Sequence, residues 1–441
     1  MDAHQRRVDN IAHQLRSASG SVHIAKAGVH HVVPLPQDSR FSSAPVDTSS
    51  LTNIVSVDPG ARRAVIEPGV SFEQLVRATL PLGLAPKTVP ELRGITAGGA
   101  VSGCSVESLS YRYGGFHDSC TTYEVVGGDG TIHLLHRGDE LFERVHGSYG
   151  TLGILTQIEC ELIEAKPFVE INYQHFTSYA PFREALTAAC DYADSDEALF
   201  VDAIVFGPTH LTLCLGRFVD TCGEPSVYSG SEIFYKSAER LTSDTMSTEE
   251  YFFRYDRECH WLTATVPPLQ WPRVRQLIGN RVLGSTNLIA LSNKIAPILR
   301  LAKRRPDLVC DIFIPSRNFD EFWQWYCEVF NFWPLWVIPY RLPTKYPWLS
   351  EELREGLTDG ELFIDCAVYG KPNSHRNVDF SVLLEDKTYE LGGIKTLIGR
   401  NHYTQERFWH IYDRDGYDRA KAVLDPTRRF PNLFDKLGNV D

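Results

Sequence analysis

The chain has 441 residues, of which 43% are hydrophobic, and its formal net charge is −12. A chain of this length and composition can bury a large core and is expected to form two or three domains. The excess of acidic residues argues against nucleic-acid binding, which normally needs a basic surface. It also does not favour binding to an anionic membrane.

Residues 3–17 repeat apolar side chains at helical spacing and predict an amphipathic helix. No apolar signal core is present, and no stretch reaches the roughly 18 consecutive apolar residues that a membrane helix needs. We therefore expect an intracellular, cytoplasmic protein without an integral membrane segment. The ten cysteines lack the spacing of a metal site, so we expect buried thiols and no bound metal.

The next elements are strands. Residues 22–28 predict a first strand and its exit loop, and residues 51–70 predict two strands joined by the turn Asp58-Pro59-Gly60. Ser71 is a good N-cap for the helix that follows.

The segment from Thr88 to Gly130 is rich in glycine at one point: Gly98, Gly99 and Gly103 lie close together. Glycine lets main-chain N–H groups approach a phosphate or a flat ring, so this segment predicts a loop that binds a phosphate-bearing cofactor. The spacing matches neither a Walker loop nor a Gly-x-Gly-x-x-Gly fingerprint. The spacing therefore argues against both a P-loop and a Rossmann dinucleotide-binding fold.

A pair of strands follows the glycines, at 120–126 and 131–135, with a Gly-Gly-Asp-Gly turn between them. Residues 156–165 predict the last strand of this part of the chain. From there to about residue 390, aromatic-rich strands alternate with helices, and a polar stretch occupies 220–250. Helices are expected at 319–330 and 376–390, and we expect an antiparallel sheet covered on one face.

Five motifs occur in a fixed order: Thr-x-Gly-Gly at 96–99, Tyr-Gly at 113–114, Asp-Gly at 129–130, Asp-x-Leu-Phe at 139–142 and Gly-Thr-Leu-Gly-Ile at 150–154. This ordered set resembles the FAD-binding domain of the vanillyl-alcohol-oxidase (PCMH-type) flavoproteins. A narrower resemblance, to the delta-24-sterol reductase (24-dehydrocholesterol reductase, Diminuto) family, is carried by 89–92, 103–108, 120–124, Arg254, Trp261, 334–336, Ile364-Asp365 and Phe408-Trp409.

The resemblance implies an α+β fold in two domains. The PCMH-type FAD-binding domain would span 1–165 and be completed by 395–441, whose segment 421–430 resembles the part of the superfamily that packs on the flavin domain. The cap, or substrate domain, would span 166–394. The sequence leaves the oligomeric state open.

The resemblance also implies non-covalently bound FAD. The residues expected to contact it are Lys26, Gly28, Pro90, Thr96, Ala97, Gly98, Gly99, Gly103, Cys104, Ser105, Glu107, Ser108, Gly153 and Ile154. A flavin bonded covalently to His30 or His31 is the less favoured alternative, as is a role for Cys104 as a catalytic thiol.

The implied reaction is the reduction of an isolated C=C bond in a sterol- or prenyl-like substrate, with electrons from NADPH. Such an alkene must be protonated by a well-placed acid in a dry pocket, and the candidate donors are Tyr369, Glu107, Asp365, Tyr403 and His117.

Arg254 and Arg257 are expected either to bind an NADPH phosphate or to pair with carboxylates of the cap. Family members carry an N-terminal membrane segment, which this sequence does not show. We therefore expect an isoprenoid-like group to enter the cap while its head group is soluble or carrier-borne. The alternatives are an FAD-linked oxidase or dehydrogenase of an alcohol or sugar lactone, and a flavin-binding scaffold without turnover.

Overall fold

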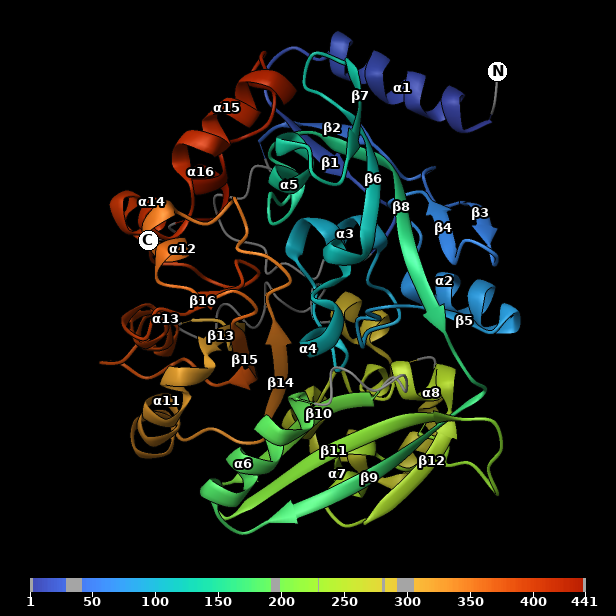
Figure 1. Cartoon of the computed structure of the whole chain (residues 1–441), viewed down its shortest axis with the longest axis vertical. Helices are drawn as coiled ribbons and strands as arrows, with labels where there is room; N and C mark the ends of the chain where they lie inside the picture. Colours follow the sequence, from blue (N-terminus) through green and yellow to red (C-terminus); the bar gives the residue numbers. More distant parts are fainter. Residues whose placement is uncertain are drawn as a thin grey trace.

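The computed structural model describes residues 3–28, 42–191, 199–228, 230–279, 282–291 and 305–438. Within these residues the strands form a two-stranded, a six-stranded and an eight-stranded sheet. The small sheet pairs β1 (Val22–Ala25) with β2 (Ala44–Asp47) in parallel. Figure 1 shows the six-stranded sheet in the upper part of the molecule and the strands β9–β12 of the larger sheet at the bottom. The fold is of the α+β class that the sequence predicted.

The six-stranded sheet has the order β3-β4-β8-β6-β7, with β5 added beside β8. Its strands are β3 (Ile54–Asp58), β4 (Arg63–Ile66), β5 (Leu84–Pro86), β6 (Cys120–Val126), β7 (Ile132–His136) and β8 (Ile154–Glu164). Neighbouring strands are antiparallel, and the two predicted turns join β3 to β4 and β6 to β7. Gly130 has a φ of 79°, a left-handed conformation that favours glycine at the second turn.

Two predicted helices are confirmed on this side of the molecule. Helix α1 (Ala3–Ser17) buries Val8, Ile11 and Leu15, the stripe that its periodicity indicated. Helix α2 (Phe72–Thr79) begins at the N-cap Ser71, whose side chain accepts a hydrogen bond from the Gln74 N–H while the Gln74 side chain bonds back. The short helices η2 (Leu80–Leu82), α4 (Ser110–Tyr113), η3 (Phe116–Ser119) and α5 (Glu140–Val145) complete this region.

The predicted glycine loop is wrong in its local form, because residues Ala97–Gly103 form the short helix α3. The N–H groups of Ala97 and Gly98 donate to the carbonyl groups of Val70 and Pro68, at 2.9 and 2.8 Å. These two amides therefore hold α3 against the turn before α2. Local glycine content predicted a loop because it does not reveal the tertiary contacts that fix this turn as helix.

The eight-stranded sheet is antiparallel throughout and has the order β12-β9-β11-β10-β14-β15-β13-β16. Its strands are β9 (Phe168–Phe176), β10 (Leu199–Gly207), β11 (His210–Val219), β12 (Ser243–Ser247), β13 (Leu308–Pro315), β14 (Leu335–Arg341), β15 (Leu362–Lys371) and β16 (Ile394–Lys395). One face packs on α6 (Tyr179–Cys190), α11 (Phe319–Trp325) and α13 (Phe380–Glu390). The predicted sheet covered on one face by helices agrees with this arrangement.

Side-chain alternation separates the two faces of this sheet. On β15, Ile364, Cys366 and Val368 belong to the core under the helices, so Asp365 and Tyr369 lie on the opposite face. On that face, Trp336, Ile338 and other apolar side chains share one continuous core with the six-stranded sheet. The two sheets therefore meet through the face that carries the polar side chains of β13 and β15.

The structure refines three predicted segments of this region. The expected helix at 376–390 begins only at Phe380, because the Asp379 side chain accepts from the Ser381 N–H and caps it. The expected helix at 319–330 continues from α11 into the π-helical turn η10 (Tyr326–Phe330). The polar stretch 220–250 contains α7 (Phe234–Ala238) and β12, elements too short to show a clear period.

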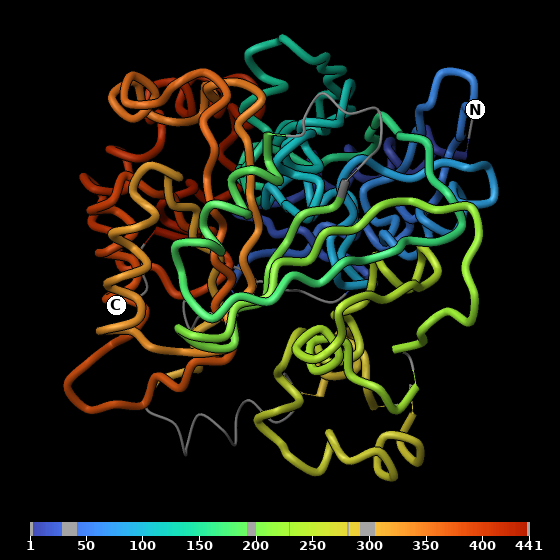
Figure 2. The backbone as a smooth tube through the Cα atoms, turned by 60° about the horizontal axis from the view of Figure 1, so that its bottom comes forward, coloured from blue at the N-terminus to red at the C-terminus, as the bar shows by residue number. Residues whose placement is uncertain are grey.

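The remaining elements are α8 (Thr248–Phe252), η5 (Asp256–Glu258), η6 (Leu262–Thr265), η7 (Pro267–Gln270), α9 (Pro272–Ile278), η9 (Ser316–Asn318), α12 (Glu351–Glu355), α14 (Gln405–Ile411), α15 (Arg414–Leu424) and α16 (Leu433–Leu437). The yellow part of the chain in Figure 2, which includes α9, projects beyond the strands. Among the described residues, no helix combines the length and apolarity needed to cross a bilayer.

The C-terminal segment returns to the first part of the chain. Lys421 Nζ donates to the Thr151 carbonyl oxygen at 2.6 Å, the Val22 N–H donates to the Arg429 carbonyl at 2.9 Å, and Phe430 packs in the core beneath α1. In Figure 1, α15 and α16 lie beside α5. The boundaries 1–165 with 395–441, and 166–394, stay a prediction that these contacts support.

Candidate active site

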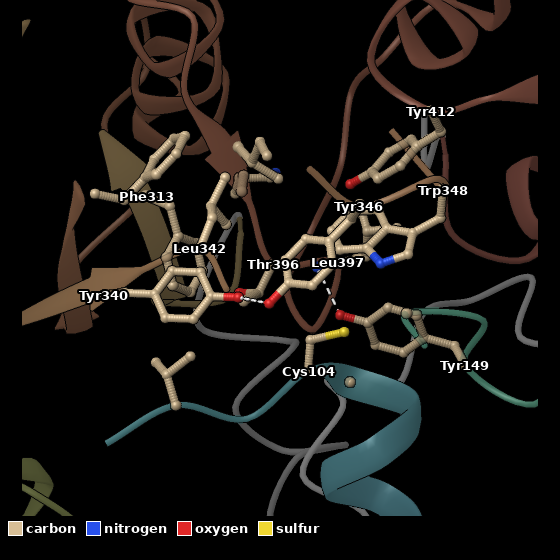
Figure 3. A pocket seen from close by; sticks show the side chains of 16 residues that line it. Cys104, Tyr149, Phe313, Tyr340, Leu342, Tyr346, Trp348, Thr396, Leu397 and Tyr412 are labelled. Carbon is tan, nitrogen blue, oxygen red and sulfur yellow. Dashed lines mark hydrogen bonds between the residues drawn. The ribbon is translucent and has the colours of Figure 1, made fainter. Parts of the chain in front are cut away.

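A cavity of about 610 Å³, counting its open mouth, lies where the C-terminal end of α3 meets the inner face of the eight-stranded sheet. The walls are mainly aromatic and aliphatic (Figure 3). They come from the segments at 103–106 and 147–149, from the eight-stranded sheet with the loop after β14, and from the C-terminal region. The lining residues are Gly103, Cys104, Val106, Gly147, Tyr149, Phe313, Tyr340, Leu342, Tyr346, Trp348, Phe363, Ile394, Lys395, Thr396, Leu397 and Tyr412.

Two tyrosines of the cavity wall point their hydroxyl groups at each other. Tyr340, on β14, and Tyr346, in the loop that follows, share a hydrogen bond (Figure 3). The Tyr346 hydroxyl also donates to Asp118 Oδ2 at 2.6 Å. We call Tyr340, Tyr346 and Asp118 the tyrosine–aspartate relay. Burial raises the pKa of both tyrosines, so both phenols keep their protons.

The turn before β6 is shaped around Asp118. The Gly115 N–H donates to Asp118 Oδ2 at 2.7 Å, and a Cβ at Gly114, where φ is 75°, would lie 2.3 Å from the same oxygen. The Tyr-Gly-Gly sequence at 113–115 thus lets the main chain close on this carboxyl group. Burial raises the pKa of Asp118 to about 7, against the hydrogen bonds from Tyr346 and Gly115.

His117, a predicted proton donor, lies beside this carboxyl group. Its Nε2 is 3.3 Å from Asp118 Oδ2, and its ring centroid is 4.8 Å from that of His146. Burial, with a further contribution from His146, lowers the pKa of His117 well below its usual value. His117 is therefore a neutral imidazole, and this placement does not favour it as the acid.

A buried ion-pair network occupies a separate place between the sheets. Arg254 reaches Glu107 Oε1 at 3.1 Å and Asp202 Oδ2 at 3.0 Å, and its side chain has no exposed surface. Trp336 and Tyr255 also donate to Asp202 Oδ2, at 2.8 and 3.2 Å. Of the two roles considered for Arg254, the structure supports pairing with cap carboxylates, because a buried guanidinium presents no surface to a cofactor phosphate.

Glu107, a predicted proton donor and FAD contact, is held inside this network. Its second oxygen accepts from the Ser108 N–H and hydroxyl. Burial raises the pKa of Glu107 to about 7 despite the nearby guanidinium. None of these contacts reaches the cavity, so the placement does not favour Glu107 as a donor to a substrate.

Two other predicted donors, Asp365 and Tyr369, lie together on the inner face of β15. The Tyr369 hydroxyl donates to Asp311 on β13, and the His260 ring centroid is 4.3 Å from that of Tyr369. His260 Nε2 in turn is 2.9 Å from Glu91 Oε1. These five residues form the β13–β15 acid cluster.

Burial dominates the electrostatics of this cluster. It raises the pKa of Asp311 to about 6 and that of Asp365 well above its ordinary value, with further contributions from neighbouring carboxylates. Within the described residues, Asp365 Oδ1 is buried without a hydrogen-bond partner. The cluster adjoins the cavity without lining it: Phe313 pairs with Asp365 across the strands, and Thr396 Oγ1 lies 3.4 Å from Asp311 Oδ2.

The predicted donor Tyr403 lies elsewhere, in the core formed by the C-terminal helices. Its ring packs on Phe408 and below Lys395, and it does not line the cavity. The structure therefore brings Asp365 and Tyr369 together and leaves Glu107 and Tyr403 in two other places.

Comparison with known proteins bears on the cofactor. Residues 6–136 match the family model described as an FAD binding domain. This part of the chain is therefore an FAD-binding domain, and the protein is a flavoprotein. The match covers the six-stranded sheet up to β7 and the glycine segment, where the sequence motifs predicted the cofactor.

Relatives of this flavoprotein extend the match through the cap. The human delta(24)-sterol reductase is 26% identical over 407 residues, which cover 88% of this chain and 76% of the relative. The delta(24)-sterol reductase homolog of Caenorhabditis elegans is 24% identical over 474 residues and covers 99% of this chain and 88% of its own. A decaprenylphosphoryl-beta-D-ribose oxidase of Mycolicibacterium smegmatis is 32% identical over 121 residues, which is 26% of this chain.

The residues around the glycine segment of the flavoprotein fit a flat cofactor with polar edges. A Cβ built at Gly99 would meet only the Thr96 hydroxyl at 3.2 Å, and one at Gly103 would meet only the Tyr149 ring at 3.9 Å. Space is therefore left beside Gly103, whereas the Thr96 hydroxyl lies close beside Gly99. At Gly98, by contrast, a Cβ would lie 2.6 Å from Pro68, so packing within the protein already requires that glycine. Trp348 Nε1 lies at the cavity and is buried without an acceptor among the described residues.

The other predicted FAD contacts of the flavoprotein fall into three places. Gly28 adjoins the glycine segment, since its Cβ would lie 3.4 Å from Thr96, and the first loop thus meets α3. Gly153 and Ile154 pack on Val126 of β6, away from the cavity. Pro90 is buried and Lys26 partly buried, whereas His30 and His31 lie outside the described residues. These assignments stay predictions.

All ten cysteines of the flavoprotein are free thiols. Burial raises the pKa of the Cys104 thiol, which makes it a poor nucleophile and agrees with its interpretation as a small residue near the cofactor. Within the described part of the chain, no group of three or more His, Cys, Asp or Glu side chains is placed to hold a metal ion.

Sequence reasoning missed Asp118, Tyr340 and Tyr346 as a set. Each looks ordinary alone, and the only local signal is that Tyr340 is on the same face of β14 as Trp336 and Ile338. It also missed Asp311, although this carboxyl group alternates with the apolar residues Cys310 and Ile312 on β13 and so must face the other side of the sheet.

Proposed function

We propose that this flavoprotein reduces an isolated C=C bond in a sterol- or prenyl-like substrate. The observation that carries the proposal is that likeness to the delta(24)-sterol reductases runs through the cap as well as the FAD domain, over 88% of this chain for the human protein. The largely apolar cavity between the two regions supports it, because such a cavity accepts an apolar alkene and excludes water.

Reduced FAD, when bound, supplies a hydride. The protein must then supply a proton to the other alkene carbon. An isolated alkene has no neighbouring oxygen to take up negative charge, so its protonation comes first and produces a tertiary cation. The lining residues Phe313 and Phe363 present faces without competing nucleophiles, and Gly103 leaves room for the non-covalent cofactor. We infer that the cavity orients the alkene and keeps the cation from water.

We propose NADPH as the electron donor. Arg254 is buried, which leaves Arg257 as the predicted residue for a phosphate. Its side chain is partly exposed, and burial, with a contribution from Arg275, lowers its pKa.

An FAD-linked oxidase of an alcohol is the second candidate. It is favoured by the likeness to the decaprenylphosphoryl-beta-D-ribose oxidase, which covers 26% of this chain. That likeness does not extend over the whole cap, whereas the likeness to the reductases does, and the reductase is therefore the function we propose.

Anaerobic flavin reduction distinguishes the two candidates. We expect NADPH to bleach the bound flavin and a sterol with one isolated side-chain double bond to restore its colour, with the saturated product found by mass spectrometry. Bleaching by an alcohol, with fast reoxidation in air, would instead establish the oxidase.

The cofactor assignment has its own test. Gly99→Val should release the flavin, because a Cβ there already lies 3.2 Å from the Thr96 hydroxyl and the larger side chain would displace this predicted cofactor contact. Gly207→Ala is the control, since a Cβ there meets nothing within 4 Å. Colour that stays with the precipitate after acid denaturation would contradict non-covalent binding.

A further inference from the structure

We propose that the tyrosine–aspartate relay delivers the proton to the cavity, with the Tyr340 hydroxyl as the group that protonates the alkene carbon. This inference rests on the proposed function for the identity of the acceptor. Its geometric content, a continuous hydrogen-bonded path from the cavity wall to Asp118, does not depend on that function.

The path is continuous at every step. Tyr340 lines the cavity and is hydrogen-bonded to the Tyr346 hydroxyl, which lies 2.6 Å from Asp118 Oδ2. The Asp118 side chain keeps 8% of its surface exposed, whereas that of Tyr346 is almost completely buried. Solvent can therefore return a proton to the relay at Asp118, whereas the Tyr346 hydroxyl in the middle of the relay is closed to it.

The protonation state of Asp118 sets the direction of the relay. When Asp118 is ionised, Tyr346 donates to the carboxylate and Tyr340 donates to Tyr346, so no hydroxyl hydrogen is available to the cavity. When Asp118 is protonated, its O–H can donate to Tyr346 and Tyr346 to Tyr340. The Tyr340 hydrogen is then free to point at the substrate.

The transfer balances at each atom. The Tyr340 O–H bond breaks as a C–H bond forms on the alkene carbon, the Tyr346 proton moves to the Tyr340 oxygen, and the Asp118 proton moves to the Tyr346 oxygen. The products are an Asp118 carboxylate and a carbocation, which takes up the hydride of the proposed reaction. Asp118 then takes a proton from water.

The surroundings of Asp118 favour a carboxyl group that changes its proton near neutral pH. The Arg137 guanidinium lies near enough to lower the pKa of Asp118, while Glu143 on α5 raises it, and burial outweighs both. His117 beside it is neutral. The other titratable groups that face Asp118 are Tyr346, Tyr340, Tyr123, Cys120 and Cys104.

The competing source of the proton is the β13–β15 acid cluster. Its carboxyl groups carry raised pKa values as well, but none of its five members lines the cavity, and its link to the wall is the 3.4 Å approach of Thr396 to Asp311. The relay ends in a hydroxyl group at the cavity itself, and for this reason we assign the donor to Tyr340.

The first experiment measures product formation by the full-length holoenzyme, reduced with dithionite, on a sterol with one isolated side-chain double bond. Tyr340→Phe should slow the reaction by roughly 10²–10⁴-fold, the usual contribution of a general acid. Asp118→Asn should also slow it and should remove the decline in rate that the wild-type protein shows as pH rises through about 7. Flavin content should stay unchanged in both.

Matched controls come from the cap. The Tyr228 hydroxyl donates to Asp244 Oδ2 at 2.5 Å, a buried tyrosine–carboxylate bond away from the cavity. Tyr228→Phe and Asp244→Asn should keep the wild-type rate and pH profile. Asp365→Asn tests the acid cluster. If this variant lost alkene reduction while Tyr340→Phe kept it, the assignment of Tyr340 as the proton donor would be overturned.

The second experiment does not use activity. Infrared difference spectra of the wild-type holoenzyme should show a protonated carboxyl band that disappears as pH rises through about 7, that is absent in Asp118→Asn, and that shifts its midpoint in Tyr346→Phe. If the wild-type protein shows this titration but reduces no alkene, the proposed function is refuted while the hydrogen-bonded relay is supported. Absence of the titration would refute the relay whatever the activity.

Discussion

The network around Arg254 and the relay around Asp118 place carboxyl groups in the same low-dielectric layer between the two sheets, yet they differ in what compensates the charge. Glu107 and Asp202 share a guanidinium that cannot lose its proton. The Asp118 carboxyl group accepts hydrogen bonds from the Gly115 N–H and the Tyr346 hydroxyl and lies beside the neutral His117. Burial nevertheless raises the pKa of both Glu107 and Asp118 to about 7, so the compensating groups alone do not separate the two carboxyl groups.

The two sites also differ in where their hydrogen bonds lead. From Glu107 they pass to Ser108, and from Ser108 to Tyr251 at 3.2 Å, within the core. From Asp118 they pass through Tyr346 to Tyr340 at the cavity. The comparison teaches that a raised carboxyl pKa alone does not mark a proton donor. A path to the reacting group is needed as well.

The largest effect should follow from removing the cation. Arg254→Met leaves two buried carboxylates without a partner, and breaking a buried pair in this way typically costs 3–5 kcal/mol, so we expect a loss of about that size in the free energy of unfolding. Urea unfolding measures it. The triple variant Glu107→Gln, Asp202→Asn, Arg254→Met should recover most of the loss. Failure to recover would show that the guanidinium acts through packing instead.

The next effect concerns Asp118 and the pH dependence of stability. Its pKa in the folded protein, about 7, lies above its ordinary value of 3.8, so the folded state holds a proton that the unfolded state has lost across this window. Stability from this group is therefore lost as pH rises toward 7. The free energy of unfolding of Asp118→Asn, measured relative to that of the wild type, should therefore rise by roughly 3 kcal/mol between pH 5 and pH 8. Thermal unfolding at several pH values checks this, and parallel curves would contradict the raised pKa.

A pH–rate profile should separate the two carboxyl groups. Burial raises the pKa of Glu107 to about 7 as well, yet Glu107→Gln should keep the inflection in the rate of alkene reduction, because its hydrogen bonds do not reach the cavity. Asp118→Asn should lose that inflection. An inflection lost in Glu107→Gln and kept in Asp118→Asn would reverse the roles assigned to the two sites.

The smallest effect is expected for the middle of the relay. Tyr346→Phe removes the hydroxyl that donates to Asp118 and so should cost about 1 kcal/mol of stability, the usual net value of one hydrogen bond. Tyr228→Phe removes a similar bond to Asp244 and should cost about as much. Urea midpoints of both variants test this, and only Tyr346→Phe should also slow alkene reduction.

Local sequence determined much of this protein. The apolar repeat of α1, the Ser71 capping box and the turns at 58–60 and 127–130 could be predicted because each depends on neighbouring residues. The order of the glycine, Tyr-Gly and Gly-Thr-Leu-Gly-Ile motifs indicated the FAD domain, which the family match confirms. The helical form of Ala97–Gly103 did not follow from glycine content, since it depends on amides that donate to the distant turn at 68–70.

The tertiary structure alone decided which polar groups meet. Tyr346 and Asp118 are 228 residues apart, and Tyr369 meets Asp311 across 58 residues through the register of β13 and β15. Alternation along one strand indicates which face a side chain occupies, but it does not indicate its partner on another strand or on another sheet. Asp365 and Tyr369 could be proposed because they lie in segments that carry the family resemblance, whereas the relay of Tyr340, Tyr346 and Asp118 appears only when the two sheets are packed together.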